Sequence, residues 1–382
     1  MKTTPTTPQR PNLLVILADD MGYSDIGCFG SEIRTPNLDR LARGGVRFSQ
    51  MYNCARCCPT RASLLTGLYP HQTGVGFMVG DQGHPGYRGR LNNHCVTIAE
   101  ALKPSGYRTF LSGKWHVGGH YQPNRPESWR PGGTDFPIPV ERGFDEHYGL
   151  LGGAGSYFHP PYMIHNRDLI RPDLERDGYY LTDDLSDQAV RMIGAAQADR
   201  RPFFLYLAYT APHWPLHAPA EDIERYRGRY CDGWDALRRA RHAKLKTLGL
   251  LDSSWPTSPR DERAPAWEDV PDKEWEDLRM AVYAAQVDRM DQGIGRVLDE
   301  LERTGALDNT LILFLSDNGG CAEFLAEDRN KPEPMRYNIP LPDGRPMRCG
   351  NSPSIAPGPE DTFASYDLPW ANASNTPFRL YK

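Results

Sequence analysis

The segment NLLVILA, residues 12–18, is a nearly unbroken apolar run that ends in the polar pair Asp19-Asp20. A short run of this kind predicts a β-strand that is buried on both faces of a sheet. Three further runs have the same character, namely YRTFL at 107–111, FFLYLAY at 203–209 and LILFL at 311–315. Strands that are apolar on both sides are typical of parallel sheets covered by helices.

Helical patterns separate these runs along the chain. They predict helices at 36–43, 97–103, 183–198 and 274–304, the last one broken near Gly293 and Gly295. Residues 117–180 are rich in glycine, proline and aromatic residues and predict long loops, and residues 220–275 predict a loop or insert. The alternation of strands and helices predicts an α/β fold, a three-layer sandwich with a large, mostly parallel sheet.

Length and composition exclude several classes of protein. The chain has 382 residues, which is enough for one large domain with a sizeable core. A formal net charge of -5 argues against a nucleic-acid binder, and no apolar stretch approaches the length of a membrane helix. Residues 1–11 are polar and lack the apolar core of a secretory signal, which favours a cytoplasmic protein, or a periplasmic or secreted one if a signal was removed.

Polar side chains with useful chemistry follow each of the four apolar runs. In chain order they are Asp19 and Asp20, then Lys114 and His116, then His213, and finally Asp317 and Asn318. Ligands of parallel α/β sheets bind beyond the carboxyl ends of the strands, so these side chains predict one composite site. The aspartate and asparagine oxygens are hard donors, and a shell of six or more oxygens suits Ca²⁺ better than Mg²⁺.

The segment CCPTRASLLTG begins at Cys57 and predicts a short helix. Pro59 suits the first turn, residues 60–66 continue the helix, and Gly67 ends it. Cys57 is therefore expected just ahead of a helix N-terminus, where unpaired amides favour negative charge. Arg61, one turn further on, can reach back toward the same position.

The pattern Cys-x-Pro-x-Arg at 57–61, followed by Leu-Leu-Thr-Gly, resembles the maturation motif of the sulfatase family. The segments GKWH at 113–116, APHWP at 211–215 and NTPFRLYK at 375–382 resemble further motifs of that family. The resemblance implies an alkaline-phosphatase-like fold and the hydrolysis of sulfate monoesters, either aryl or carbohydrate sulfates. It also implies a partner, a formylglycine-generating enzyme that oxidises Cys57 to formylglycine, whose hydrate attacks the sulfate ester.

The same resemblance implies a role for each site residue. The ligands of a divalent cation, usually Ca²⁺, would be Asp19, Asp20, Asp317, Asn318 and an oxygen of the modified Cys57. The catalytic residues would be Cys57, Arg61, Lys114, His116, His213 and Lys382. In this scheme His213 protonates the departing alcohol, and His116 removes a proton so that sulfate is expelled. A serine at position 57 would form the sulfate ester but would not release it in this way.

The resemblance extends from residue 12 to residue 382 and is weakest between 220 and 280. We therefore expect residues 1–382 to form the sulfatase catalytic α/β domain. Related sulfatases continue into a smaller C-terminal subdomain, and we expect that subdomain to be missing after Lys382, the last residue of the sequence. The sequence predicts no particular oligomeric state.

Three alternatives compete with a sulfatase. The first is a phosphonate or phosphate monoester hydrolase on the same fold. The second is a non-catalytic binder of sulfated glycans, based on the basic run RRARHAKLK at 238–246 and on nearby tryptophans, although such a run is more often a solvated helix face. The third is a thiol oxidoreductase that uses Cys54-x-x-Cys57, which fits poorly because no thioredoxin-type βαβ context surrounds this pair.

Overall fold

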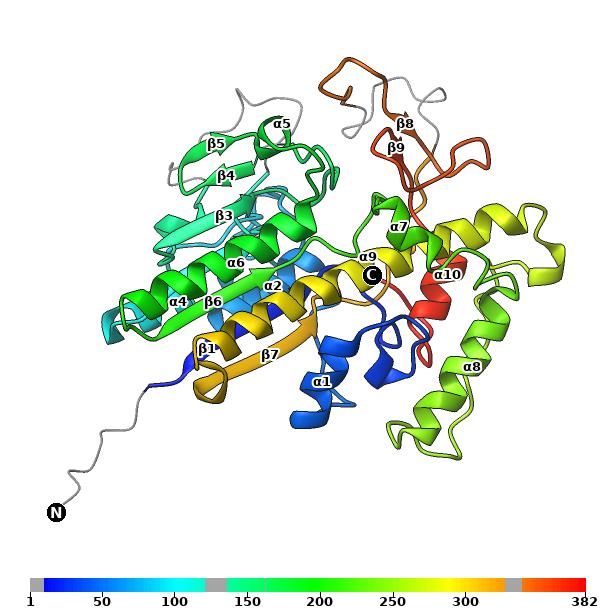
Figure 1. Cartoon of the computed structure of the whole chain (residues 1–382), viewed down its shortest axis with the longest axis horizontal. Coiled ribbons are helices and arrows are strands. Elements are labelled where there is room, and N and C mark those ends of the chain that lie inside the picture. The colour runs from blue at the N-terminus through cyan, green and yellow to red at the C-terminus, as the bar shows by residue number, and fades with distance from the viewer. Residues whose placement is uncertain (1–9, 121–135, 162, 327–338) are drawn as a thin grey trace.

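The computed structural model describes residues 10–120, 136–161, 163–326 and 339–382 (Figure 1). Its main sheet has seven strands in the order β5-β4-β3-β2-β6-β1-β7. Their bounds are β1 (Asn12–Ala18), β2 (Arg108–Gly113), β3 (Glu146–Leu150), β4 (Met163–His165), β5 (Asp168–Ile170), β6 (Phe203–Ala208) and β7 (Thr310–Ser316). The neighbours β3, β2, β6, β1 and β7 are parallel to one another, and β4 and β5 add an antiparallel edge beside β3.

Ten α-helices are assigned in the described residues. They are α1 (Pro36–Gly44), α2 (Cys57–Thr66), α3 (Pro70–Thr73), α4 (Ile98–Leu102), α5 (Pro172–Glu175), α6 (Leu181–Ala198), α7 (Ala220–Glu224), α8 (Gly233–Thr247), α9 (Lys273–Arg303) and α10 (Asp367–Ser374). A small second sheet pairs β8 (Arg348–Cys349) with β9 (Thr362–Phe363).

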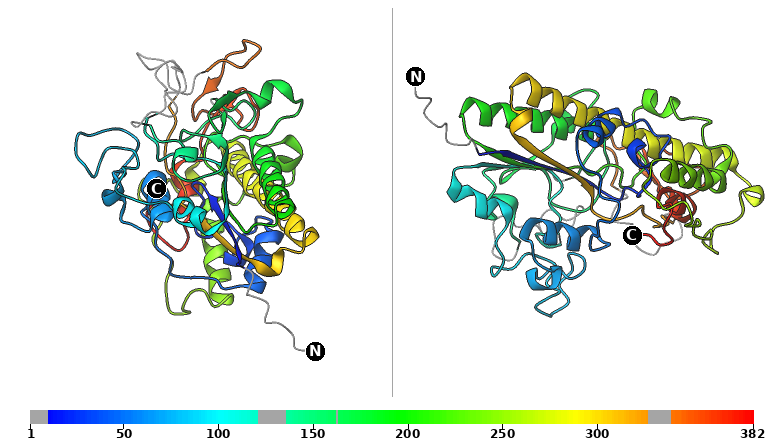
Figure 2. Two further views of the ribbon diagram at one scale, coloured as in Figure 1. Left: turned by 90° about the vertical axis from the view of Figure 1, so that its left-hand side faces the viewer. Right: turned by 90° about the horizontal axis from the view of Figure 1, so that it is seen from below.

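Helices cover both faces of the main sheet, with α6 and α9 on one side and α2 and α4 on the other (Figure 2). Alternate residues of β1 enter two separate cores, because successive side chains of a strand point to opposite faces. Leu14 and Ile16 pack with α6 and α9, whereas Val15 and Leu17 pack with α2 and α4. The expected three-layer α/β sandwich with a mostly parallel sheet is confirmed.

Helix α9 runs unbroken over 31 residues, so the predicted break near Gly293 and Gly295 is wrong. Both glycines instead permit close packing. A Cβ atom on Gly293 would lie 2.2 Å from Oγ of Ser186 in α6, and one on Gly295 would lie 2.7 Å from Nδ2 of Asn37 in α1. The weak helix propensity of glycine is overridden here by tertiary contacts.

Two segments expected as loops contain regular elements. Residues 136–161 and 163–180 include β3, β4, β5 and α5, while 121–135 and 162 lie outside the described residues. The segment 220–275 contains α7 and α8. Because α7 is short and α8 is rich in basic residues, neither shows a clear helical pattern of apolar residues in the sequence. The loop predictions for these stretches are therefore wrong in part.

The basic run on α8 does not form a continuous charged surface. Arg238 and Arg241 are buried, and Arg241 pairs with Asp25 at 2.5 Å and with Glu32 at 2.9 Å. Trp234 is also buried and makes an edge contact with Trp267. Arg238, Arg241, Trp234 and Trp267 therefore serve packing, whereas Arg239, Lys244 and Trp255 are exposed, so the support for a glycan-binding surface is weakened. Across the described ranges, no helix is both long enough and apolar enough to cross a bilayer.

Candidate active site

The carboxyl ends of β1, β2, β6 and β7 meet at one edge of the sheet, beside the first turn of α2. The ten residues expected from the sequence lie in this region. Hydrogen bonds and ion pairs link eight of them, namely Asp19, Asp20, Arg61, Lys114, His213, Asp317, Asn318 and Lys382. The other two, Cys57 and His116, contact each other, and both interact electrostatically with Lys114. All ten side chains are buried. The composite site predicted at these strand ends is therefore present as a single buried cluster of side chains.

Four of these residues, Asp19, Asp20, Asp317 and Asn318, form an oxygen cluster. The amide of Asp20 donates to Oδ1 of Asp317 at 3.2 Å, and Nδ2 of Asn318 donates to Oδ1 of Asp20 at 2.6 Å. Oδ1 of Asp19 and Oδ1 of Asn318 are buried but accept no hydrogen bond. A buried acceptor without a partner costs free energy, and hard oxygens are the donors that Ca²⁺ and Mg²⁺ prefer. This donor set therefore fits a divalent cation.

Cationic side chains surround the oxygen cluster. Nζ of Lys114 lies 2.5 Å from Oδ2 of Asp19, and Nζ of Lys382 lies 2.9 Å from Oδ2 of Asp20. The Arg61 guanidinium donates twice to Oδ2 of Asp317, at 3.1 and 2.7 Å. These pairs hold the cationic groups in place for an anionic substrate.

Asp19 and Asp317, the buried residues that directly follow β1 and β7, have pKa values that are shifted in opposite directions. Burial, together with the neighbouring Asp19 carboxylate, raises the pKa of Asp317 well above its usual range. For Asp19 burial acts in the same direction, but Lys114 and Arg61 outweigh it and hold the pKa below its usual range. Close carboxylates repel one another, so a divalent cation between them would stabilise the cluster.

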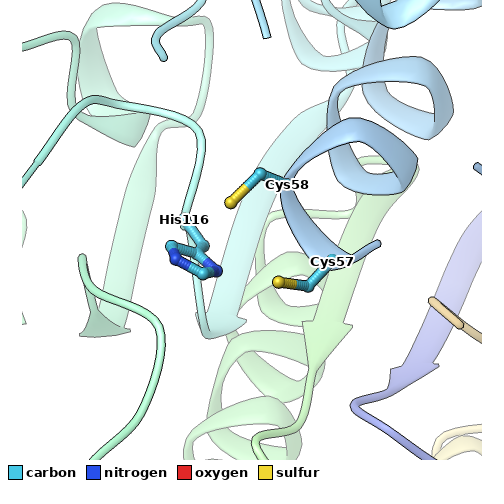
Figure 3. A group of neighbouring side chains, drawn as sticks. All are labelled: Cys57, Cys58 and His116. Carbon is cyan, nitrogen blue, oxygen red and sulfur yellow. The ribbon is translucent and has the colours of Figure 1, made fainter. Parts of the chain in front are cut away.

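A second group, the thiol cluster, consists of Cys57, Cys58 and His116 (Figure 3). Cys57 is the first residue of α2, so the helix begins three residues earlier than predicted. A hydrogen bond from Cys58, aided by His116 and Lys114, lowers the pKa of the Cys57 thiol well below its usual range. Burial raises the pKa of the Cys58 thiol, which therefore stays protonated and acts as the donor.

His213 is held so that one of its two ring nitrogens is available for proton transfer. Nδ1 lies 2.6 Å from the carbonyl oxygen of Trp214 and must donate to it, because a carbonyl can only accept. Nε2 lies 3.2 Å from Nζ of Lys382 and 3.3 Å from Oδ2 of Asp20. Nε2 is therefore the nitrogen that can give or take a proton within the site.

Two site residues adopt a left-handed backbone, Asp20 with φ 65° and His116 with φ 58°. Such conformations are uncommon for residues other than glycine, and they collect at functional sites. In an extended chain Asp19 and Asp20 would point to opposite faces. The turn at Asp20 breaks that alternation, and both carboxylates join the oxygen cluster.

Sequence reasoning missed Cys58 and Glu323. Cys58 occupies the variable second position of the maturation motif, so only its adjacency to Cys57 was a signal. Glu323 lies at the rim of the site, where its carboxylate is 3.1 Å from Arg56, accepts from Nε1 of Trp214 at 3.0 Å and is 3.8 Å from Lys382. Glu323 follows β7 in an irregular segment and belongs to no recognisable motif.

Comparisons with known proteins agree with this arrangement. A family model described as Sulfatase matches residues 11–341. An uncharacterised sulfatase of Schizosaccharomyces pombe is 37% identical over 98% of this chain and 67% of its own length. An arylsulfatase of Klebsiella aerogenes is 36% identical over 98% of this chain and 77% of its own length.

Solved structures show the same fold. The crystal structure of Ps i-CgsB has a TM-score of 0.59 and 28% identity, and the match covers 97% of this chain and 73% of that one. The PsFucS1 sulfatase of Pseudoalteromonas has a TM-score of 0.53 and 22% identity, and the match covers 90% of this chain and 58% of that one. The sheet and its helical layers are thus those of an alkaline-phosphatase-like sandwich. This chain belongs to the sulfatase family and is a sulfuric ester hydrolase.

Proposed function

We propose that the chain hydrolyses aryl or carbohydrate sulfate monoesters with a nucleophile derived from Cys57 and with a Ca²⁺ ion held by the oxygen cluster. The observation that carries this proposal is the contact network that joins position 57, two lysines, an arginine, two histidines and three carboxylates at one buried sheet edge. The arylsulfatase of Klebsiella aerogenes and the complex of Ps i-CgsB with k-i-k-neocarrahexaose support the two substrate classes.

Formylglycine at position 57 would supply a hydrated aldehyde, one hydroxyl of which attacks sulfur, and Ca²⁺ would supply positive charge beside the reacting oxygens. Asp19, Asp20, Asp317 and Asn318 would hold the ion. A formylglycine-generating enzyme would have to convert Cys57, so that partner belongs to the proposal.

The side chains around position 57 have distinct tasks in this scheme. Arg61, fixed by its two hydrogen bonds to Asp317, orients the nucleophile. Lys114 and Lys382 neutralise the sulfuryl oxygens while the bond from sulfur to the leaving oxygen breaks. Both lysines are buried beside carboxylates that, despite the opposing effect of burial, raise their pKa values, so both stay charged.

Two histidines divide the proton transfers. Nε2 of His213, which lies 3.3 Å from Oδ2 of Asp20, gives its proton to the leaving alcohol oxygen, and the positive charge of Lys382 at 3.2 Å favours the loss of that proton. Burial lowers the pKa of His116, which keeps its imidazole neutral and able to accept a proton. With formylglycine at position 57, His116 would accept the proton whose removal lets sulfate leave.

The first test replaces the nucleophile with Cys57→Ser. A serine hydroxyl can accept the sulfuryl group but has no second hydroxyl with which to expel it, so we expect at most one turnover per chain. Burst kinetics with an aryl sulfate and the intact mass of the protein would show a trapped ester. Steady-state turnover at the wild-type rate in a chain whose position 57 is verified as serine would refute the assignment.

A second test concerns the group that is transferred. An aryl sulfate and an aryl phosphonate with the same leaving phenol isolate the preference for sulfur over phosphorus. We expect a higher kcat/KM for the sulfate, and a higher value for the phosphonate would favour the phosphonate hydrolase alternative. Comparing aryl sulfates with sulfated sugars then distinguishes between the two proposed substrate classes.

A further inference from the structure

The thiol cluster contains more soft donors than the proposed reaction uses. Sγ of Cys57, Sγ of Cys58 and a ring nitrogen of His116 lie within 4.8 Å of one another. Figure 3 shows both sulfurs directed toward the imidazole, the cysteines from α2 and the histidine from the segment after β2. The three side chains are buried, and Nδ1 of His116 has no hydrogen-bond partner.

Two thiols and an imidazole are donors that Zn²⁺ prefers, in contrast to the hard oxygens close by. In tetrahedral zinc sites the bond lengths place neighbouring ligand atoms about 3.5–3.8 Å apart. The ligand atoms of the cluster therefore need to approach by roughly an ångström or less, which small side-chain rotations supply.

We propose that the unconverted chain, in which Cys57 is still a thiol, binds Zn²⁺ through Cys57, Cys58 and His116. On binding, any proton that the two cysteines still hold is released to solvent, so two thiolates balance the charge of the ion. The nearby cations do not prevent this, since Lys114 is paired with Asp19 and Arg61 with Asp317. Water fills the fourth position.

Cys54 is not part of this site, although it stands in a Cys-x-x-Cys spacing with Cys57. Its Sγ lies 3.5 Å from Oγ of Ser63, a residue in the second turn of α2. Cys54 is therefore a matched control for Cys58, because both flank Cys57 and only Cys58 belongs to the cluster.

Binding of this kind would withhold the Cys57 thiol from oxidation, and conversion of Cys57 would in turn abolish the site. This consequence rests on the proposed function, whereas the binding itself does not. Zn²⁺ would then bind to immature chains, in which Cys57 is a thiol, and not to mature ones.

The test uses the full chain produced without an activating enzyme, with intact mass verifying a thiol at position 57. Ca²⁺ is kept in excess to occupy the oxygen cluster, and Zn²⁺ or Co²⁺ is titrated. We expect one bound Zn²⁺ per chain, a sulfur-to-cobalt charge-transfer band with Co²⁺, and affinity weakened roughly tenfold or more by Cys58→Ala through loss of a ligand. Cys54→Ala should bind as the wild type does.

A second measurement needs no variant. Peptide mapping after iodoacetamide treatment should show that Zn²⁺ slows alkylation of Cys57 and Cys58 and leaves Cys231 unaffected. Equal affinity in the wild type and in Cys58→Ala, loss of binding in Cys54→Ala, absence of the charge-transfer band, or unchanged alkylation of Cys57 would each overturn the proposal. None of these readouts involves sulfate hydrolysis, so their failure leaves the proposed function untouched.

Discussion

The oxygen cluster and the thiol cluster lie side by side in one site, yet they differ in almost every chemical respect. The first offers carboxylates and an amide that come from the ends of β1 and β7, and its cationic partners are already in contact with it. The second offers two sulfurs and an imidazole from α2 and the segment after β2. The contrast indicates that a hard cation would bind to the oxygen cluster and a thiophilic ion to the thiol cluster.

The strongest test of this division is Asp317→Asn, which removes one negative charge from the oxygen cluster and weakens the hold on Arg61. We expect kcat/KM for an aryl sulfate to fall by about a thousandfold or more, because ion binding and orientation of the nucleophile are lost together. Calorimetry with Ca²⁺ should show binding abolished, while alkylation of the thiol cluster in unconverted protein stays close to wild type.

Asp291→Asn is the matched control for that variant. Asp291 is also a buried carboxylate, but it accepts hydrogen bonds from the amides of Asn37 and Leu38 at the start of α1, away from the site. We expect it to retain Ca²⁺ binding. Retention of Ca²⁺ binding in Asp317→Asn would show that the oxygen cluster does not hold the ion.

A smaller effect is expected for Lys382→Ala, which removes the ammonium group between Asp20 and His213. We expect kcat to fall about a hundredfold for sulfates of poorly acidic alcohols, and less for nitrophenyl sulfate, whose leaving group needs little protonation. A plot of rate against leaving-group pKa measures this difference. Lys382→Arg should recover part of the loss, and an equal loss across all leaving groups would argue against a role in proton transfer.

The smallest effect concerns the pH dependence of the thiols in the unconverted chain. Because the pKa of Cys57 is lowered well below its usual range, its alkylation rate should fall much less steeply between pH 8 and pH 6 than that of an ordinary thiol, whose pKa is about 8.5. Burial and Asp277 raise the pKa of Cys231. The alkylation rate of Cys231 should therefore fall about tenfold for each unit by which the pH is lowered. Peptide mapping at each pH measures both rates in one sample. A tenfold fall per unit at Cys57 as well would contradict the thiolate assignment.

The two clusters also differ in how far the sequence predicts them. The oxygen cluster is predictable because buried strands read as apolar runs, and the carboxyl ends of parallel strands must meet at one edge. Its four residues, Asp19, Asp20, Asp317 and Asn318, do lie together at that edge. Their catalytic and metal-binding roles remain predictions that rest on the family resemblance.

What the sequence conceals is set by tertiary packing. The contact of Cys58 with Cys57 depends on the first turn of α2 beginning at Cys57 rather than after it. The continuity of α9 depends on neighbours that fill the space beside Gly293 and Gly295. The burial of Arg241 depends on acidic partners more than 200 residues away, at Asp25 and Glu32. No local pattern contains that information.

The place of β1 in the sheet has a consequence for biosynthesis. Its two neighbours are β6 and β7, and Asn12 pairs with Thr310 at a sequence separation of 298 residues. Strand β1 therefore leaves the ribosome well before β6 and β7 and gains both partners only after β7 is made, and contacts so distant in sequence favour slow folding. During that interval the apolar strand β1 is exposed and can pair with other chains. We therefore expect the yield of refolded protein, after dilution from denaturant, to fall as the protein concentration rises.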